Sequence, residues 1–447
     1  MNKYDELRLK YPTFVFEKYD YKIIDNKIKI TFYFSIPGLT EFSPSYEIDR
    51  KYFEKLDSFA EVLIFHIGMI ELISYWKATC SPKVIIKAGY LDENQINWFK
   101  KLYFYGLGEL FYRNSITNTE EDFMDITCEK VYENINCNYE GKGNLIPIGG
   151  GKDSCVTMEI LKSEYDDNDC FIINPKTVTL DCANIGGYKE KTITVKRILD
   201  SKLIELNKQG FINGHTPFSS LVAFVSYFMA YLNNKKYIIL SNEASANEET
   251  VIGLKVNHQY SKTFEFENDF NNYTKKYFNI DIKYFSLLRP LSELQIGFLF
   301  SKYNQYHKTF RSCNVGSKYD PWIWCCNCPK CLFVYIILSP FLDKKELLDI
   351  FNEDLFSKKE LLDTFIELIG DAKTKPFECV GTIKEVRYAT TLAIKKYEKN
   401  LPFLLKYYKD NYELVEEDLL EEYNATNNLE NKFESLLKEE INASRNN

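Results

Sequence analysis

The sequence predicts an α/β fold around a doubly wound parallel sheet, with an α+β domain before it and a helical region after it. Three observations support this. From residue 145 onward, apolar runs of strand length alternate with helical patterns, which is typical of a parallel sheet covered by helices. An alternating pattern near the N-terminus indicates a hairpin, and the chain beyond residue 340 is charged and helically periodic. The 447 residues suffice for two or three domains, and we expect them at 1–138, 139–340 and 341–447.

The N-terminal region predicts mixed α and β elements. Apolar residues alternate on both sides of Asp25 and Asn26, a pair that favours a tight turn between two strands. We expect a hairpin, a helix, a strand and a second helix over residues 21–34, 53–78, 83–87 and 94–112. The stretch Val62–Ile70 is too short and too closely flanked by acidic residues to span a bilayer, which favours a buried helix. No chemical motif is evident in residues 1–135.

The central region alternates between strands and helices. The expected strands are 145–149, 170–174, 192–197, 237–241 and 282–288. The expected helices are 154–163, 177–185 and 217–232, the last with Thr216 as N-cap and Pro217 at its first position. Ligands of such sheets bind beyond the carboxyl ends of the strands. Polar clusters occur there: 149–154, Asn174, 241–247 and Arg289.

Beyond residue 340 the pattern is helical. Apolar residues recur at helical spacing in three charged stretches, and the last part of the chain is acidic and then mixed in charge. We expect helices over 344–350, 358–369 and 382–404, and a solvated helix with a frayed end over 413–447.

The most informative motif is the run from Leu145 to Cys155, in which an apolar strand pattern enters three glycines and a helix follows. Glycines allow positive φ and a close approach of the backbone to an anion. The N-terminus of the next helix favours a phosphate group. Lys152 can neutralise its charge, Ser154 can add a hydroxyl, and Asp153 can cap the helix or hold Mg²⁺.

This motif resembles the PP-loop of ATP pyrophosphatases, S-G-G-x-D-S, with Gly149 in place of the first serine. The resemblance implies a fold of the PP-loop/HUP type and cleavage of ATP to AMP and diphosphate. We expect ATP to contact a loop and one residue after the next strand, namely Gly149, Gly150, Gly151, Lys152, Asp153, Ser154 and Asn174. An ordinary strand-to-helix turn is the alternative for the glycine run alone.

Two further segments are rich in amides, carboxylates and hydroxyls. One is 242–247 and the other is 257–267, which contains His258, a candidate general acid or base. Such groups can hold a polar ligand, although a polar capped loop is the simpler interpretation of each. His215 precedes the helix at 217 and could bind a ligand or belong to a capped turn.

Five of the twelve cysteines lie between residues 313 and 331. Cys313, Cys325, Cys328 and Cys331 have spacings that suit a four-thiolate zinc site, and such sites are usually structural. Cys326 is an additional thiol. Buried or reactive thiols at a helix start are the alternative. A similar cluster occurs in the 7-cyano-7-deazaguanine synthases, which resemble this chain in the PP-loop as well.

Composition excludes some classes of function. Hydrophobic content is 45% and charged content is 27%, as in globular proteins. The net charge of −8 argues against a nucleic-acid partner. The N-terminus lacks the apolar segment of a signal peptide, so we expect a cytoplasmic protein without a membrane partner.

Taken in order, these motifs resemble the MurL-type UDP-N-acetylmuramoyl-L-alanyl-L-glutamate epimerases over residues 144–340. The resemblance rests on 149–154, Asn213 to His215, Ser241 to Glu243, Asn257 to Lys262 with Glu265, and Cys325 to Cys331. It implies ATP-dependent inversion of the terminal L-Glu of UDP-MurNAc-L-Ala-L-Glu to D-Glu in peptidoglycan precursor synthesis. The carboxylate would be adenylated, with release of AMP and diphosphate.

The resemblance also implies roles for individual residues, with ATP, Mg²⁺ and Zn²⁺ as the cofactors. The catalytic candidates are Asp153, which places Mg²⁺, and the proton carriers His258, Glu243 and Cys326. The candidates for binding the UDP-muramoyl dipeptide are Asn213, His215, Asn242, Asn247, Asn257, Tyr260, Lys262, Glu265 and Arg289. The alternatives are another PP-loop enzyme, such as a 7-cyano-7-deazaguanine synthase or a tRNA-modifying enzyme, and a non-catalytic nucleotide-binding protein.

Overall fold

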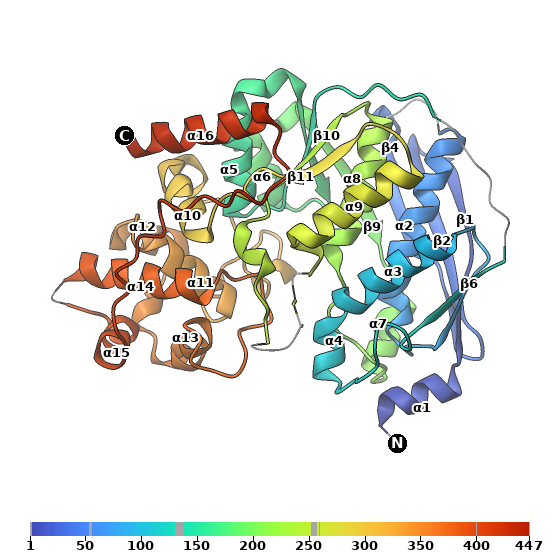
Figure 1. The fold of residues 1–447 in the computed structure, drawn as a ribbon, viewed down its shortest axis with the longest axis horizontal. Coiled ribbons are helices and arrows are strands. Elements are labelled where there is room, and N and C mark those ends of the chain that lie inside the picture. The colour runs from blue at the N-terminus through green and yellow to red at the C-terminus, as the bar shows by residue number, and fades with distance from the viewer. Residues whose placement is uncertain are drawn as a thin grey trace. The chain divides into compact units, whose positions relative to one another are not determined.

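The computed structural model describes residues 2–52, 56–129, 137–251, 257–258, 260–398 and 400–446. It shows a mixed α/β fold with a large sheet and many helices (Figure 1). The chain forms two compact units, each assembled from three separate segments. Unit 1 contains 1–145, 193–238 and 256–284, and unit 2 contains 146–192, 239–255 and 285–447. The predicted domain boundaries at 138 and 340 stay a prediction.

Unit 1 is built on an antiparallel meander that continues into parallel strands. Its strands are β1 (Thr13–Ile24), β2 (Lys27–Ile36), β3 (Thr40–Phe42), β4 (Ser45–Asp49), β5 (Lys83–Ile86), β6 (Asp125–Cys128) and β9 (Thr192–Ile198). Strand β1 pairs antiparallel with β2 and parallel with β5, while β4 lies between β2 and β9. Asp25 and Asn26 take φ of 48° and 61° in the turn, which confirms the predicted hairpin.

Several helices belong to unit 1. They are α1 (Lys3–Lys10), α2 (Ser58–Trp76), α3 (Glu93–Gly106), α4 (Gly108–Arg113), α7 (Ser201–Lys208), α8 (Phe218–Leu232) and α9 (Phe264–Tyr277). Helix α2 is capped by the Asp57 side chain and is long and apolar enough by composition to cross a membrane, but 83% of its most apolar stretch is buried inside the structure. It packs against α8 and the strands β1 and β2. The prediction of a buried helix is therefore confirmed.

In unit 2 the strands alternate with helices as predicted. Strands β7 (Asn144–Pro147), β10 (Tyr237–Leu240) and β11 (Lys283–Ser286) each begin in unit 1 and end in unit 2, and β8 (Asn168–Ile173) lies in unit 2. Strand β10 pairs parallel with β7. The helices are α5 (Lys152–Ile160), α6 (Thr177–Ile185), α10 (Glu293–Lys302), α11 (Pro329–Leu338), α12 (Lys344–Phe351), α13 (Leu362–Leu368), α14 (Ile383–Tyr397), α15 (Phe403–Asn411) and α16 (Asn431–Asn446).

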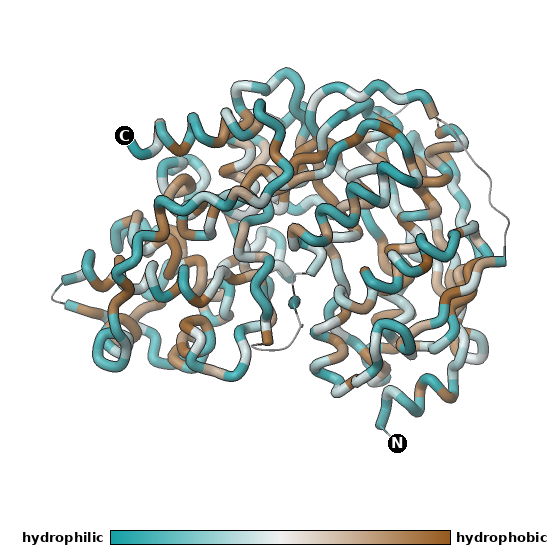
Figure 2. The backbone as a smooth tube through the Cα atoms, viewed as in Figure 1, coloured by the Kyte–Doolittle hydropathy of each residue, from teal (hydrophilic) through white to brown (hydrophobic). Residues whose placement is uncertain are grey.

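Beyond α11, the described part of the chain contains helices and irregular segments but no strand. Helix α16 is amphipathic and mostly hydrophilic (Figure 2), and its apolar Phe433 and Leu437 are buried. Together with the strand–helix alternation, this confirms a mixed α/β architecture, while the doubly wound PP-loop/HUP arrangement stays a prediction.

Several predicted helix boundaries are wrong, each for a local reason. The helix expected over 94–112 divides at Leu107, because glycines at 106 and 108 weaken it there. The helix expected over 382–404 ends at Tyr397, where Glu398 takes φ of 50°, and a new helix starts after Pro402. The helix expected from 413 begins only at Asn431. Pro217, predicted as the first helical residue, instead occupies the cap of α8.

A buried ion pair joins a strand and a helix of unit 1. Arg197 on β9 donates from Nε and Nη2 to the two oxygens of Glu71 on α2, both at 2.8 Å, and Tyr46 donates to the same carboxylate at 2.6 Å. The Glu71 side chain is fully buried. Removing one partner leaves a charge buried without its counterion, which costs more than a surface pair contributes.

We expect Glu71→Ala to lower the free energy of unfolding by about 3–5 kcal/mol, because the Arg197 guanidinium would stay buried. Urea unfolding followed by circular dichroism measures this. The control is Asp281→Ala, which removes the exposed pair with Lys236 and should cost less than about 1 kcal/mol. Equal losses for the two variants would contradict the structural role of the buried pair.

Candidate functional site

The glycine run forms a tight turn between β7 and α5 in unit 2. Gly150 has φ of 78°, which favours glycine, and Gly151 is the N-cap of α5 with extended backbone. The Ser154 hydroxyl donates to the Gly151 carbonyl at 3.0 Å. The first turn of α5 therefore follows directly from the loop, an arrangement that can receive an anion at the helix N-terminus.

The loop packs closely against its neighbours. A Cβ atom on Gly150 would lie 3.2 Å from Thr179 on α6, and one on Gly151 would lie 2.9 Å from the Ser312 hydroxyl. The Arg311 amide donates to the Gly150 carbonyl at 2.9 Å. Segment 311–312, which the sequence did not single out, thus lies beside the loop. Side chains larger than hydrogen at 150 and 151 would disturb this packing.

A buried group of charged side chains lies at the start of α5. Lys152 is 1% exposed and makes ion pairs with Asp153 and with Glu293 of α10. Asp153, Glu243 and Glu293 each offer a carboxylate oxygen, and these atoms lie within 4.8 Å of one another. The main-chain amide of Glu293 donates to the side-chain carboxylate of the buried Glu385, with a distance of 2.6 Å to Oε1. Unit 2 therefore gathers several carboxylates around one ammonium group beside the glycine loop.

Burial and charge act in opposite directions in this group. Burial alone would lower the pKa of Lys152, but the carboxylates of Asp153 and Glu293 outweigh it and raise the pKa. Burial raises the pKa of Glu293 to about 7, and the neighbouring charges of Asp153 and Glu243 add to this effect while Lys152 opposes it. Lys152 therefore stays charged, and a further cation would relieve the repulsion among the acids.

The other residues predicted after strand ends occupy different positions in unit 2. Arg289 is fully buried and donates from Nη1 to the Glu243 carbonyl at 2.9 Å, so it holds the 242–247 segment in place. The carbonyl of Asn242 accepts from Ser286 at 2.6 Å. Asn174 is exposed after β8 with φ of 54°, and Asn247 is exposed at the end of a 3₁₀ turn. Of the residues predicted after the strand ends, Glu243 lies close to the carboxylates of Asp153 and Glu293.

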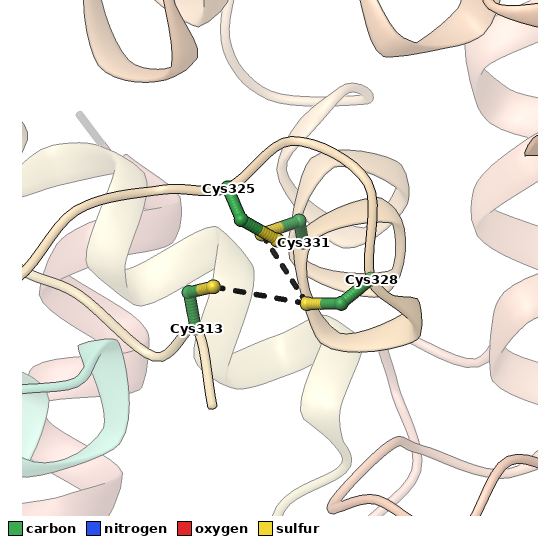
Figure 3. Close-up of side chains that lie close together, drawn as sticks. All are labelled: Cys313, Cys325, Cys328 and Cys331. Atoms are coloured by element: carbon green, nitrogen blue, oxygen red, sulfur yellow. Dashed lines mark hydrogen bonds between the residues drawn. The ribbon is translucent and has the colours of Figure 1, made fainter. Parts of the chain in front are cut away.

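Four cysteines converge near the start of α11 (Figure 3). The Sγ atoms of Cys313 and Cys328 are 3.8 Å apart, those of Cys325 and Cys331 are 3.8 Å apart, and those of Cys328 and Cys331 are 3.5 Å apart. Four thiolates about 2.3 Å from a tetrahedral zinc ion would be about 3.8 Å from one another. The arrangement fits a structural zinc ion.

The backbone around these thiols supports the same interpretation. The Gly316 amide donates to Cys313 Sγ at 3.0 Å, and a Cβ on Gly316 would lie 1.8 Å from the Ile323 carbonyl oxygen. Only glycine can occupy that position. Cys326, in contrast, donates to the Phe351 carbonyl at 3.0 Å and lies outside the set of four. Burial is the main cause that raises the pKa of the Cys326 thiol to about 12, so it is protonated at neutral pH.

Unit 1 contains a second group of titratable side chains. His258 Nδ1 lies 2.6 Å from Glu109 Oε2, and the rings of His258 and His215 have centroids 4.2 Å apart. Arg113 Nε lies 2.6 Å from the other Glu109 oxygen. Lys77 donates to the carbonyl of Gly214 at 2.8 Å. Glu109 belongs to the region in which the sequence showed no chemical motif.

The pKa values in this group follow from burial and from the neighbouring charges. Burial is the largest cause that lowers the pKa of His215 to about 3, and the charges of His258, Lys77 and Lys262 add to it. Burial lowers the pKa of Lys77 to about 8. For Glu109, burial would raise the pKa, but the hydrogen bond and charge of His258 outweigh it, so the pKa is lowered. Glu109 is therefore a carboxylate and His215 is neutral at neutral pH.

The remaining predicted substrate residues lie in unit 1. Tyr260 is buried against Tyr105, with ring centroids 5.3 Å apart. Lys262 ends the same 3₁₀ turn as Tyr260, and Asn257 is half-buried just before it, whereas Gln259 lies outside the described residues. Exposed Glu265 pairs with Lys101 at 2.7 Å on the first turn of α9, and Asn213 is exposed. The predicted residues are thus divided between the two units.

Sequence reasoning missed the carboxylates of Glu109, Glu293 and Glu385. Glu293 could have been found, because Ser292 and Gln295 form a capping box that places it at the first position of a helix after the fifth central strand. Glu385 could have been found in the same way, because Thr382 and Glu385 form a capping box at the start of α14. Glu109 lies in ordinary helical sequence, where nothing local marks it. The assignment of roles to the predicted residues stays a prediction.

The sequence matches two domains of one family. Residues 6–287 match the MurL N-terminal domain, and residues 309–422 match the MurL C-terminal domain. Three proteins described as UDP-N-acetyl-alpha-D-muramoyl-L-alanyl-L-glutamate epimerase are among its relatives. The one from Xanthomonas oryzae pv. oryzae (strain MAFF 311018) is 32% identical over 338 residues, which is 74% of each chain.

The other two relatives are similarly close. The protein from Salinispora tropica is 31% identical over 344 residues, covering 76% of this chain and 74% of its own. The protein from Micromonospora sp. (strain ATCC 39149) is 32% identical over 324 residues, covering 72% of each chain. The similarity therefore extends well beyond the glycine loop and the cysteine cluster.

Proposed function

This chain belongs to the MurL epimerase family, and we propose from that membership that it inverts the terminal L-Glu of UDP-MurNAc-L-Ala-L-Glu to D-Glu. The observation that carries the proposal is the match to both MurL domains, together with relatives described as this epimerase. The product would serve peptidoglycan precursor synthesis. A reaction that uses ATP and a nucleotide-linked precursor would take place in the cytoplasm.

We further propose that ATP activates the glutamate before its stereocentre changes. The Cα proton beside a free carboxylate is very weakly acidic, because its removal would place two negative charges together. Transfer of AMP to the α-carboxylate removes that charge and makes the proton far more acidic. A base then removes the proton, a proton returns to the opposite face, and water cleaves the acyl adenylate. The net reaction releases AMP and diphosphate.

The residues of the glycine loop suit the phosphate chemistry of this proposal. Main-chain N–H groups in the first turn of α5 and the Lys152 ammonium are donors for phosphate oxygens. Gly149 is exposed, with no atom within 4 Å of the place that a Cβ would occupy, so the backbone there is open to an anion. The loop would orient ATP and bind the diphosphate leaving group.

The carboxylates of Asp153, Glu243 and Glu293 would hold Mg²⁺. Their oxygens lie within 4.8 Å of one another, and the Lys152 ammonium already lies against two of them, so this donor set suits a cation. A bound Mg²⁺ stabilises negative charge on phosphate oxygens. The protein's own contribution is to fix these three oxygens from the first turns of α5 and α10 and from the segment after β10.

The decisive experiment incubates the protein with UDP-MurNAc-L-Ala-L-Glu and Mg²⁺ in D₂O, with and without ATP. We expect deuterium at Cα of the terminal glutamate, and D-Glu by chiral analysis, only when ATP is present. AMP should form together with D-Glu. The control replaces ATP with a non-hydrolysable α,β-methylene analogue, which cannot transfer AMP. ATP consumption without deuterium at Cα would contradict the epimerase proposal while leaving the PP-loop proposal in place.

A further inference from the structure

The Glu109 and His258 side chains form a geometry that the proposed reaction has not yet used. Glu109 Oε2 lies 2.6 Å from His258 Nδ1, although the two residues are 149 positions apart in the chain. The Glu109 side chain is 10% exposed and the His258 side chain is 11% exposed, so this hydrogen bond is largely shielded from water. A charged acceptor in such surroundings makes a strong hydrogen bond.

This contact determines which nitrogen of the histidine can act as a base. A carboxylate can only accept, so Nδ1 carries the proton and Nε2 carries the lone pair in the neutral ring. Arg113, one turn after Glu109 on α4, lies 2.6 Å from the other carboxylate oxygen and fixes the carboxylate from the opposite side. Glu109 thus selects the tautomer of His258 and would stabilise its protonated form.

Glu109, His215 and His258 offer possible metal-ligand atoms within 4.8 Å of one another, but the positive charges beside them disfavour a metal cation. His215 lies against His258 at 4.2 Å between ring centroids and is kept neutral, mainly by burial. The positive charges of Lys77 and Lys262 also lower the pKa of His215. Two ammonium groups beside the imidazoles oppose a metal cation and attract an anionic substrate. A substrate with a diphosphate and free carboxylates has the matching charge.

We propose that His258 Nε2 carries the Cα proton of the terminal glutamate and that Glu109 is its positioning residue. This inference rests on the proposed function. The Cα–H bond breaks and an N–H bond forms at Nε2, while the electron pair of the C–H bond moves into the activated acyl group to give an enolate. A water molecule donates a proton to the opposite face of Cα as that electron pair reverts, and the hydroxide that remains is neutralised by the proton that His258 Nε2 releases to solvent. Glu109 balances the positive charge that His258 gains.

The test measures two half-reactions with UDP-MurNAc-L-Ala-L-Glu, ATP and Mg²⁺. Deuterium uptake from D₂O at Cα reports proton transfer, and exchange of labelled diphosphate into ATP reports adenylation. We expect Glu109→Gln to lower deuterium uptake about 100-fold and His258→Gln to lower it at least as much, while diphosphate exchange persists in both. The double variant should be no slower than His258→Gln, because Glu109 acts through His258.

The pH profile separates a positioning role from a structural one. Among the described residues, His258 contacts Glu109 on α4 and His215 before α8, Arg113 lies against Glu109, and the charges of Lys77 after α2 and of Lys262 act on His215. Glu109→Gln removes the only negative charge in this set. The midpoint of the deuterium-uptake profile should therefore move to lower pH by about one unit. Glu109→Asp, which keeps the charge, should restore the midpoint of the wild-type profile.

Two control variants change the same residue types at positions away from the Glu109–His258 pair. Glu93→Gln on the exposed first turn of α3 and His307→Gln in unit 2 should leave deuterium uptake unchanged. Absence of ATP-dependent uptake in the wild-type protein would overturn the proposed function itself. Normal uptake in the wild type, with an unshifted profile for Glu109→Gln or additive losses in the double variant, would overturn only the role of Glu109. If Glu109→Gln does not fold, the profile of Glu109→Asp and the loss in His258→Gln decide the question.

Discussion

Replacement of Asp153 by asparagine is expected to slow formation of AMP and diphosphate by about 1,000-fold or more. The side chain lies on the first turn of α5, pairs with Lys152 and belongs to the set of three carboxylates that we propose for Mg²⁺. Asparagine has nearly the same shape but no charge. A loss of this size corresponds to about 4 kcal/mol of transition-state stabilisation, within the range of metal-assisted charge stabilisation. Quantification of AMP by chromatography measures it.

The matched control is Asp363→Asn. Asp363 is exposed on the first turn of α13 in the same unit, so its loss removes an acid from a helix start without touching the charged group at the glycine loop. Its AMP formation should equal that of the wild type. Both variants should unfold at nearly the wild-type temperature, because Lys152 keeps its buried pair with Glu293. ADP and phosphate as the wild-type products would refute the PP-loop assignment.

Removal of one thiol from the cysteine cluster is expected to have the largest effect on stability. Cys331→Ala should reduce the zinc content of protein purified without chelator from about one ion per chain to nearly none. Binding of zinc by four thiolates is worth about 10–16 kcal/mol in small domains, so loss of the ion should lower the free energy of unfolding by at least about 4 kcal/mol. Metal analysis and urea unfolding measure the two effects.

Cys326→Ala provides the matched comparison within the same cluster. Its thiol donates to the Phe351 carbonyl and lies outside the set of four, so the variant should retain zinc and lose only about 1 kcal/mol. A wild-type protein that is free of metal yet as stable as the zinc-loaded form would show that the four thiols have another role. Loss of zinc from Cys326→Ala would show that the ligand set is wrong.

Elements with strong local signals could be predicted from the sequence. All five central strands, the hairpin at Asp25 and Asn26 and the buried helix α2 follow from periodicity and turn residues. Boundaries were less predictable, because Leu107 and Glu398 interrupt helical patterns that continue on both sides. The antiparallel pairing of β4 with β9, from segments about 150 residues apart, has no local signal at all.

The candidate site was predictable to the extent that its residues are close in sequence. The glycine loop and the Cys-x2-Cys spacing are local patterns that carry their chemistry with them. Glu293 meets Lys152 across 141 positions and Glu109 meets His258 across 149, so only folding brings these pairs together. Arg289 also meets its partner only in the folded chain, where it donates to the Glu243 carbonyl, and its predicted role in substrate binding stays a prediction.

The interleaving of the two units has a consequence for synthesis of the protein on the ribosome. The chain passes between them five times, since each unit consists of three alternating segments. Unit 1 lacks its last segment until residue 284 has been made, and unit 2 lacks its largest segment, 285–447, until translation ends. Neither can complete its core as an early, independent intermediate, so nascent chains would expose apolar strands for most of elongation and depend on chaperones. For the same reason, truncation after residue 284 would leave unit 2 as fragments that cannot fold.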